Sequence, residues 1–241
     1  RAAQGHSTPV ARAKAVCSAL AERKQKQGFV GGTRVEARNT PPLIASAALA
    51  AIEKDGARVA LYPLEAAALV VAALRSLDVP ALLAEVYRYP DEQRPLDPSG
   101  RVGYYAVALP KTQGAPEQLF DAFGGRSTSP AARDYKILND AQALGAALSL
   151  RALTQLDNSG DTRGGLADSE LAVKLTPSSA TVRSVRAALL LSTGGVEAGT
   201  RELDAAFSLR SDAPRRNNLA TLGLLSGNAD AAAKEIAAAL A

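Results

Sequence analysis

The sequence predicts an α+β domain over residues 1–128, with helices and an antiparallel sheet, followed by an all-α domain of helical hairpin repeats over residues 129–241. Three observations lead to this prediction. The first half mixes runs in which apolar residues have helical spacing with short runs in which apolar and polar residues alternate. Beyond residue 134 only the helical spacing is found. In that second half, similar residues also recur every 34 positions.

The first half contains three predicted helices and four predicted strands. The helices cover residues 8–27, 40–56 and 63–77. The strands cover residues 57–62, 80–89, 101–109 and 117–123, the last two joined by a turn. Thr40 is a suitable N-cap for the second helix, and Gly56 suits its end. Residues 89–100 are rich in Pro, Asp and Gly and predict a loop, and residues 124–134 predict a linker.

The repeat of the second half is visible in four sets of equally spaced residues. These sets are Gly160, Gly194 and Asn228; Gly165, Gly199 and Ala233; Ala172, Ala206 and Leu240; and Leu175 with Leu209. Each unit is expected to be a helix, a tight turn at Gly or Asn, a second helix and a break that contains Pro. Small residues at fixed positions are expected where paired helices cross closely.

This pattern resembles the tetratricopeptide repeat over about 100 residues and about three units. The chain lacks the large aromatic residues usual in that motif, and also the basic and Asn pattern with which some such domains bind a C-terminal carboxylate. The resemblance implies a concave surface that holds a peptide or a partner helix. By motif register, the residues facing it are Thr181, Ser184, Ala188, Arg215, Asn218 and Leu222.

The stretch "RSLDVPALLAEVY" at residues 75–87 resembles part of the transglutaminase-like, papain-related superfamily. In that family a catalytic Cys begins a helix, and a Pro in the turn after the helix follows it at a characteristic interval. Here Pro80 stands in the turn, and counting back by that interval reaches Pro63, where the Cys is expected. The family's His opens a later strand, where this chain has Tyr105, or Tyr104 if the register slips by one. Its Asp corresponds to Asp121.

The resemblance therefore implies a domain that has lost two of its three catalytic groups. Proline suits a helix start but supplies no nucleophile. A phenol with a pKa of about 10 replaces a histidine base poorly. Asp121 is then expected to hydrogen-bond a tyrosine hydroxyl as a structural element. The tyrosines Tyr62, Tyr87, Tyr89, Tyr104 and Tyr105 either line the former cleft or pack across adjacent strands.

Composition excludes several functions. The net charge of +4 is modest and the basic residues are scattered, so no nucleic-acid partner is predicted. A single cysteine, Cys17, and a single histidine, His6, exclude an internal disulfide and argue against a metal site; no cofactor is expected. No stretch is apolar enough to predict a transmembrane segment. A chain that starts with Arg and lacks Met is expected to be trimmed, which permits a secreted or periplasmic origin and leaves the compartment open.

The sequence thus predicts a non-catalytic protein-binding or scaffold protein with a protein or peptide partner, alone or as a subunit of a larger assembly. The predicted binding residues are Tyr62, Tyr104, Tyr105, Asp121, Ser184, Arg215 and Asn218. An apolar last helix, residues 230–241, favours the assembly, because a terminal repeat normally has a polar outer face. The alternative is a hydrolase or amide-transfer enzyme with an unrecognised nucleophile, for which Cys17 is the thiol candidate and Glu65 with Asp97 the carboxylate pair. The oligomeric state stays open.

Overall fold

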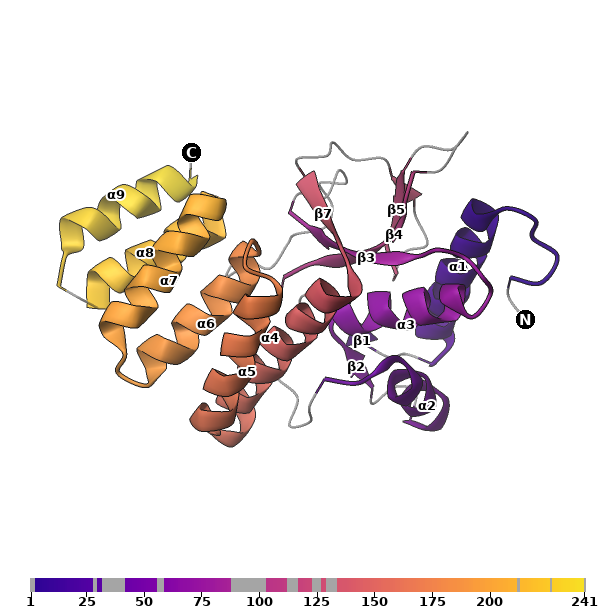
Figure 1. Ribbon diagram of the computed structural model, residues 1–241, viewed down its shortest axis with the longest axis horizontal. Coiled ribbons are helices and arrows are strands. Elements are labelled where there is room, and N and C mark those ends of the chain that lie inside the picture. Colours follow the sequence, from indigo (N-terminus) through magenta and orange to yellow (C-terminus); the bar gives the residue numbers. More distant parts are fainter. Residues whose placement is uncertain are drawn as a thin grey trace. The chain divides into compact units, whose positions relative to one another are not determined.

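A computed structural model describes residues 3–27, 30–31, 42–55, 59–87, 103–111, 117–122, 127–128, 134–211, 213–225 and 227–240. The chain separates into two compact units (Figure 1). The first unit holds the described residues up to Ala143, and the second holds those from Leu144 onward. In the described residues, an antiparallel sheet with helices is followed by a helical C-terminal region, as the sequence predicted.

The first unit contains three helices and seven strands among its described residues. They are α1 (Pro9–Gln27), β1 (Val30–Gly31), α2 (Ala45–Asp55), β2 (Ala60–Leu61), α3 (Pro63–Arg75), β3 (Leu82–Val86), β4 (Tyr105–Leu109), β5 (Gln118–Phe120), β6 (Ser127–Thr128) and β7 (Tyr135–Leu138). Strands β1 and β2 form a small parallel pair. The other five form an antiparallel sheet in the order β6-β5-β4-β3-β7.

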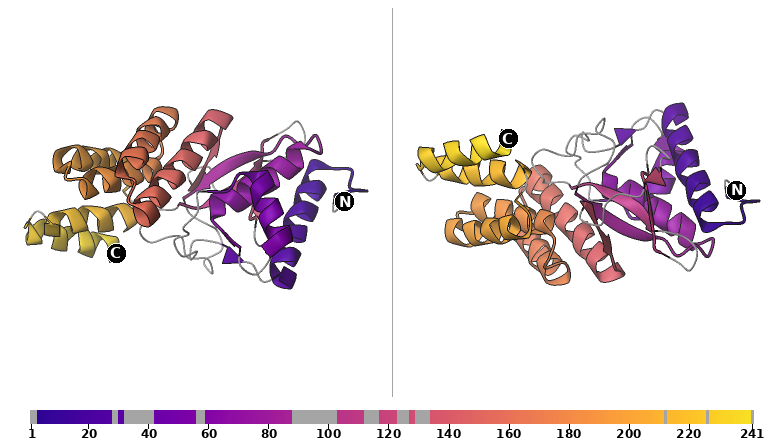
Figure 2. Two further views of the ribbon diagram at one scale, coloured as in Figure 1. Left: turned by 90° about the horizontal axis from the view of Figure 1, so that it is seen from below. Right: turned by 90° about the horizontal axis from the view of Figure 1, so that it is seen from above.

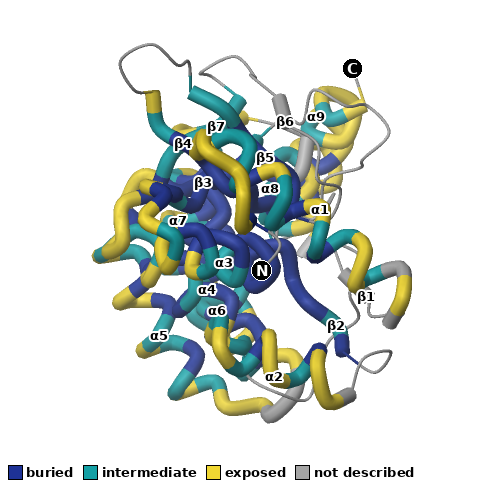
Figure 3. The backbone as a smooth tube through the Cα atoms, turned by 90° about the vertical axis from the view of Figure 1, so that its right-hand side faces the viewer, coloured by how far each residue is buried: buried dark blue, intermediate teal, exposed yellow. Residues whose placement is uncertain are grey.

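Helix α3 is the central helix of the first unit. It is buried over most of its length, as the dark blue tube of Figure 3 shows, because apolar side chains occupy nearly every turn. It packs against β3 and β4 on one side, and α1 and α2 pack against it in turn. The chain that leaves α3 turns at Asp78, which has a φ of 57°. A non-glycine residue accepts this conformation more readily when it is Asp or Asn.

Two strands differ from the sequence prediction. Residues beyond 134 were expected to be helical, yet β7 pairs with β3 from Leu83↔Leu138 to Val86↔Tyr135. Strand β6 lies within the predicted linker and pairs with β5. Both strands are too short for an alternation of apolar and polar residues to be recognised in the sequence. They form because β3 and β5 offer hydrogen-bonding edges, which are partners distant in the chain.

Six helices follow the sheet in the described part of the chain. They are α4 (Asp140–Ser159), α5 (Thr162–Leu175), α6 (Ala180–Ser192), α7 (Val196–Leu209), α8 (Ala213–Leu225) and α9 (Ala229–Leu240). Helices α6 and α7 pack as one pair and α8 and α9 as another, which both views of Figure 2 show. Buried residues of α4, α5 and α6 share two apolar clusters, one around Leu189 and one around Val182.

Each pair of helices turns at a glycine in the left-handed region. These are Gly160, Gly194 and Gly227, with φ values of 64°, 81° and 75°. The step from Gly194 to Gly227 is thus one position shorter than the step from Gly160 to Gly194. The expected turn residue Asn228 instead caps α9, because its Oδ1 accepts from the backbone N–H of Ala231 at 3.1 Å. The predicted third-unit positions Ala233 and Leu240 are exposed, and the buried small residue is Ala232.

An arginine of the first helix in each pair binds an acidic residue of the second. These pairs are Arg151 with Asp168 (2.6 Å), Arg183 with Glu202 (2.8 Å) and Arg216 with Glu235 (3.0 Å). Glu202 also forms an ion pair with Arg186, with 3.3 Å between Oε1 and the arginine Nε. We call these contacts the arginine clasps. Both side chains are partly buried in the pairs of Arg183 and Arg216, whereas the Arg151 side chain is 47% exposed. Charge-assisted contacts of this kind favour one orientation of a helix against its neighbour.

Candidate functional site

Tyr104 and Asp121, which the family resemblance predicted at the His and Asp positions, contact each other where β4 begins and β5 ends. The Tyr104 hydroxyl donates to Asp121 Oδ1 at 3.0 Å, and both residues are buried. Tyr104 directly precedes β4, and its carbonyl accepts from the N–H of Val86. Asp121 follows β5, which is the neighbour of β4 in the sheet. The expected hydrogen bond between Asp121 and a tyrosine hydroxyl is therefore present.

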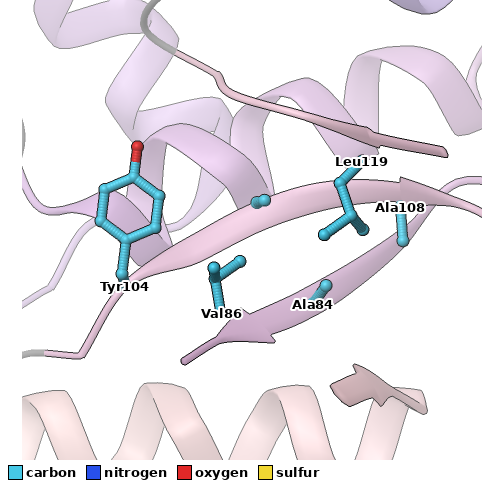
Figure 4. Packing of buried hydrophobic residues seen from close by; sticks show 6 residues of the cluster. Ala84, Val86, Tyr104, Ala108 and Leu119 are labelled. Atoms are coloured by element: carbon cyan, nitrogen blue, oxygen red, sulfur yellow. The ribbon is translucent and has the colours of Figure 1, made fainter. Parts of the chain in front are cut away.

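The ring of Tyr104 lies at one end of an apolar cluster on this face of the sheet (Figure 4). The buried members of the cluster are Ala84, Val86, Tyr104, Ala106, Ala108 and Leu119. Alternation along a strand places Tyr105 on the opposite face. The structure thus brings Tyr104, rather than Tyr105, to Asp121. The ring of Tyr104 packs in the apolar cluster of the sheet, and its hydroxyl donates a hydrogen bond to the buried Asp121 carboxyl group.

Pro63 occupies the first turn of α3, where its missing N–H costs nothing. Tyr62 is the N-cap residue, and it is buried. The backbone N–H of Tyr62 donates to Glu65 Oε2 at 2.7 Å, as in a capping box. The start of α3 is therefore well formed, and Pro63, the residue that the resemblance aligned with the family's Cys, has no exchangeable side-chain proton.

Glu65 has a structural explanation. Its second carboxylate oxygen, Oε1, accepts from the backbone N–H of Leu43 at 2.6 Å. One buried side chain thus satisfies two backbone donors and ties the segment before α2 to the start of α3. The other member of the proposed carboxylate pair, Asp97, lies outside the described residues, as does Tyr89. Tyr87 is half-buried, and its N–H donates to the carbonyl of Asp134 at 2.6 Å.

The predicted binding residues of the second unit lie on α6 and α8. Ser184 is buried and donates to the carbonyl of Ala180 in its own helix at 2.8 Å. Arg215 is buried and donates through Nη2 to Thr181 Oγ1 at 3.0 Å. Asn218 and Leu222 are half-buried. The structure brings Thr181 and Arg215 together and makes both part of the helix packing.

Cys17 is fully buried in α1. Burial raises the pKa of its thiol from 9.0 to about 12, because the thiolate would lose its hydration. A nucleophilic cysteine needs the opposite shift. Among the described residues, no group of three His, Cys, Asp or Glu side chains is placed to hold a metal ion. Within the same ranges, none of the helices has the length and apolar character needed to cross a bilayer.

The register predicted for the third repeat unit was displaced by one residue. Counting from the cap residues Asp161, Gly195 and Asn228 aligns α5, α7 and α9. With this alignment, Gly165, Gly199 and Ala232 are equivalent, and all three are buried. A Cβ at Gly165 would lie 3.2 Å from the carbonyl of Ala152, so small residues here allow close helix approach.

Comparison of the chain with protein-family models, with curated proteins and with solved structures gives no match.

Proposed function

We propose that this chain is a non-catalytic protein-binding or scaffold protein. A transglutaminase-like unit without the Cys–His pair precedes a tetratricopeptide-like stack of helix pairs, and the stack docks a helix of a partner protein. The proposal rests on the exposure of helix α9. Apolar side chains of α9 are exposed to solvent at positions where the equivalent residues of α5 and α7 pack against neighbouring helices.

Equivalent positions of α5, α7 and α9 differ in their exposure to solvent. Eight residues after the cap lie Ser169 in α5, Leu203 in α7 and Ile236 in α9. Their exposed fractions are 0%, 4% and 43%. A large aliphatic side chain is thus exposed at a position that is otherwise part of the helix packing.

The position twelve residues after the cap repeats this difference. Val173 packs on the cluster that contains Val182 of α6. Phe207 lies under the guanidinium of Arg216 of α8, whose Cζ is 5.3 Å from the ring centroid. The equivalent residue of α9, Leu240, is 84% exposed. In α5 and α7 this position contacts the next helix of the stack, so a helix is the structure that fits the same face of α9.

The former catalytic region supports a binding role in preference to chemistry. Pro63 carries no nucleophile, and Tyr104 holds Asp121 in a buried hydrogen bond. Cys17 is buried with a raised pKa. None of these groups is arranged to attack a carbonyl.

The test uses the full chain with Ile236→Lys and Leu240→Lys combined. A partner captured with the wild-type chain is purified, and its affinity is measured by calorimetry. We expect the double variant to bind at least tenfold more weakly, on the order of the loss seen when charges enter an apolar contact. The matched control, Leu144→Lys with Leu171→Lys, changes leucines that are 54% and 46% exposed on α4 and α5 and should bind as wild type.

A photo-crosslinking amino acid at position 236 identifies what covers the face. Crosslinks to a helix of the partner support the proposal. Equal affinity of both double variants would overturn it. So would a dimer of this chain in light scattering that the Ile236→Lys, Leu240→Lys variant abolishes, because a second copy would then occupy the face.

A further inference from the structure

The first unit contains a pocket of about 420 Å³ among α1, α2 and α3. Its volume lies within the roughly 300–1,000 Å³ in which proteins hold small ligands. The pocket exists because small residues, Ala19 of α1 and Ala73 of α3, stand where the two helices face each other. Larger side chains there would close the space between packed helices.

The walls of the pocket are apolar. Val16 and Leu20 of α1 line one side, and Leu69 and Val70 of α3 line the other. Leu49 of α2 lies at the opening and is 40% exposed. Ser76 is one of two polar lining residues, and its hydroxyl donates to the carbonyl of Ala73 at 2.8 Å. An occupant therefore needs an apolar body.

Arg23 is the one ionisable residue among those lining the pocket in the described part of the chain. It lies in α1, one turn beyond Ala19. Its Nη1 contacts Glu53 Oε1 at 3.5 Å, and both side chains are largely exposed. A single long contact between exposed charges is weak, so the guanidinium can turn to an anion at the pocket mouth. Arginine can bind a carboxylate through two parallel hydrogen bonds, whereas Arg23 makes a single contact with Glu53.

We propose that this pocket binds a small amphipathic carboxylate. The alkyl or aryl body lies between α1 and α3, and the carboxylate lies at Arg23. The proposal concerns the first unit only and does not depend on the helix-docking face of α9. It adds a small-molecule site to a unit in which the former catalytic positions are filled by Pro63 and the Tyr104–Asp121 pair.

Decanoate is the probe, and decan-1-ol is its uncharged counterpart. Binding of [1-13C]decanoate to the full chain is followed by NMR, and its dissociation constant is measured by calorimetry at low and high salt. We expect decanoate to bind more tightly than decan-1-ol, with the difference reduced by salt because the charge contact lies at the surface.

Two variants locate the site, each with a matched control. Arg23→Gln should weaken decanoate binding about threefold while leaving decan-1-ol unchanged, since one exposed charge contact is lost. Lys26→Gln removes a cation from the same helix outside the pocket and should have no effect. Ala73→Phe fills the pocket and should weaken both probes at least tenfold. Ala72→Phe places the same ring on the exposed side of α3 and should bind as wild type.

Three outcomes would overturn the proposal. They are no decanoate binding by the wild-type chain at millimolar concentration, equal binding by the Ala73→Phe and Ala72→Phe variants, and equal affinity for decanoate and decan-1-ol. Circular dichroism of each variant confirms that a loss of binding comes from a folded chain.

Discussion

Arg215 of α8 donates a hydrogen bond through Nη2 to the hydroxyl oxygen of Thr181 in α6, at 3.0 Å, and both residues are buried. The two residues are 34 positions apart in the chain. A guanidinium stays charged at every accessible pH, so its burial requires hydrogen-bond acceptors. The arginine clasps join helices within a pair, whereas this contact joins one pair to the next.

Removing the Thr181 hydroxyl should loosen that junction. We expect Thr181→Val to lower the free energy of unfolding by about 1–2 kcal/mol, because the buried guanidinium loses an acceptor. The measurement is equilibrium unfolding in urea. Thr200→Val is the control, since the Thr200 hydroxyl donates only to the Val196 carbonyl one turn earlier. It should cost less than about 0.5 kcal/mol. Equal losses in the two variants would show that the hydroxyl of Thr181 has no special role.

The Tyr104–Asp121 pair should behave as one energetic unit. We expect Tyr104→Phe to destabilise the chain by about 1–3 kcal/mol, because a buried carboxyl group loses a donor. Asp121→Asn should cost a similar amount. The double variant should cost clearly less than the sum, with a coupling of about 1 kcal/mol or more. Additive effects in this double-mutant cycle, measured by urea unfolding, would contradict the hydrogen bond.

The clasp at Glu202 should contribute more than an exposed ion pair on the same helix. Glu202 accepts a hydrogen bond from Arg183, forms an ion pair with Arg186 and is only partly exposed. We expect Glu202→Gln to lower the free energy of unfolding by about 1 kcal/mol, because two arginines lose their charged partner. Glu197→Gln, in an exposed pair with Arg201, should have almost no effect. High salt should narrow the difference between the variants. No difference at low salt would show that the clasp is not stabilising.

Cys17 should react slowly in the folded chain. Its pKa of about 12 lies above the ordinary value of 9.0, so the thiolate is scarce at neutral pH and the sulfur is buried. We expect a thiol reagent to label the native chain at least about a hundredfold more slowly than the chain in urea. Labelling as fast as that of a free thiol would instead revive Cys17 as a nucleophile.

The same shift predicts a pH dependence of stability. The folded state holds the thiol proton more tightly than the unfolded state, so the stabilisation is complete below about pH 9. It is lost as the pH rises from about 9 toward 12. Comparing wild type with Cys17→Ala across this range separates the thiol from lysine and tyrosine titration. Parallel stability curves for the two chains would contradict the raised pKa.

The sequence predicted the helices of the first unit because their apolar spacing is local information. The helix predicted over residues 63–77 is α3, which ends at Arg75. Strand β7 was not predicted, because a strand this short shows little alternation of apolar and polar residues. Its formation also depends on pairing with β3, which is distant in the chain. The choice between Tyr104 and Tyr105 likewise required the register of β4, which its neighbouring strands determine.

The sequence predicted the repeat length of 34 residues, but not the one-residue shift that places the third unit. Leu175 and Leu209 end α5 and α7 at a spacing of 34, whereas Ala180 and Ala213 begin α6 and α8 at a spacing of 33. The chain is thus one residue shorter between α7 and α8. A loop tolerates such a loss without changing the helices, so the helix sequences themselves give no sign of it. For this reason the predicted turn and buried position of the third unit, Asn228 and Ala233, each lie one residue after the observed ones, Gly227 and Ala232.

The position of α9 also determines how the chain opens. Each helix of the stack is held by its neighbours, and α9 packs chiefly against α8. Opening it breaks one helix contact and the Arg216–Glu235 clasp, and leaves the clusters around Val182 and Leu189 intact. Amide hydrogen exchange should therefore be fastest in α9 and slow progressively toward α6. A partner helix docked on Ile236 and Leu240 would slow amide exchange in α9 before it slowed exchange elsewhere in the stack. Exchange in α9 would therefore report whether a partner is bound.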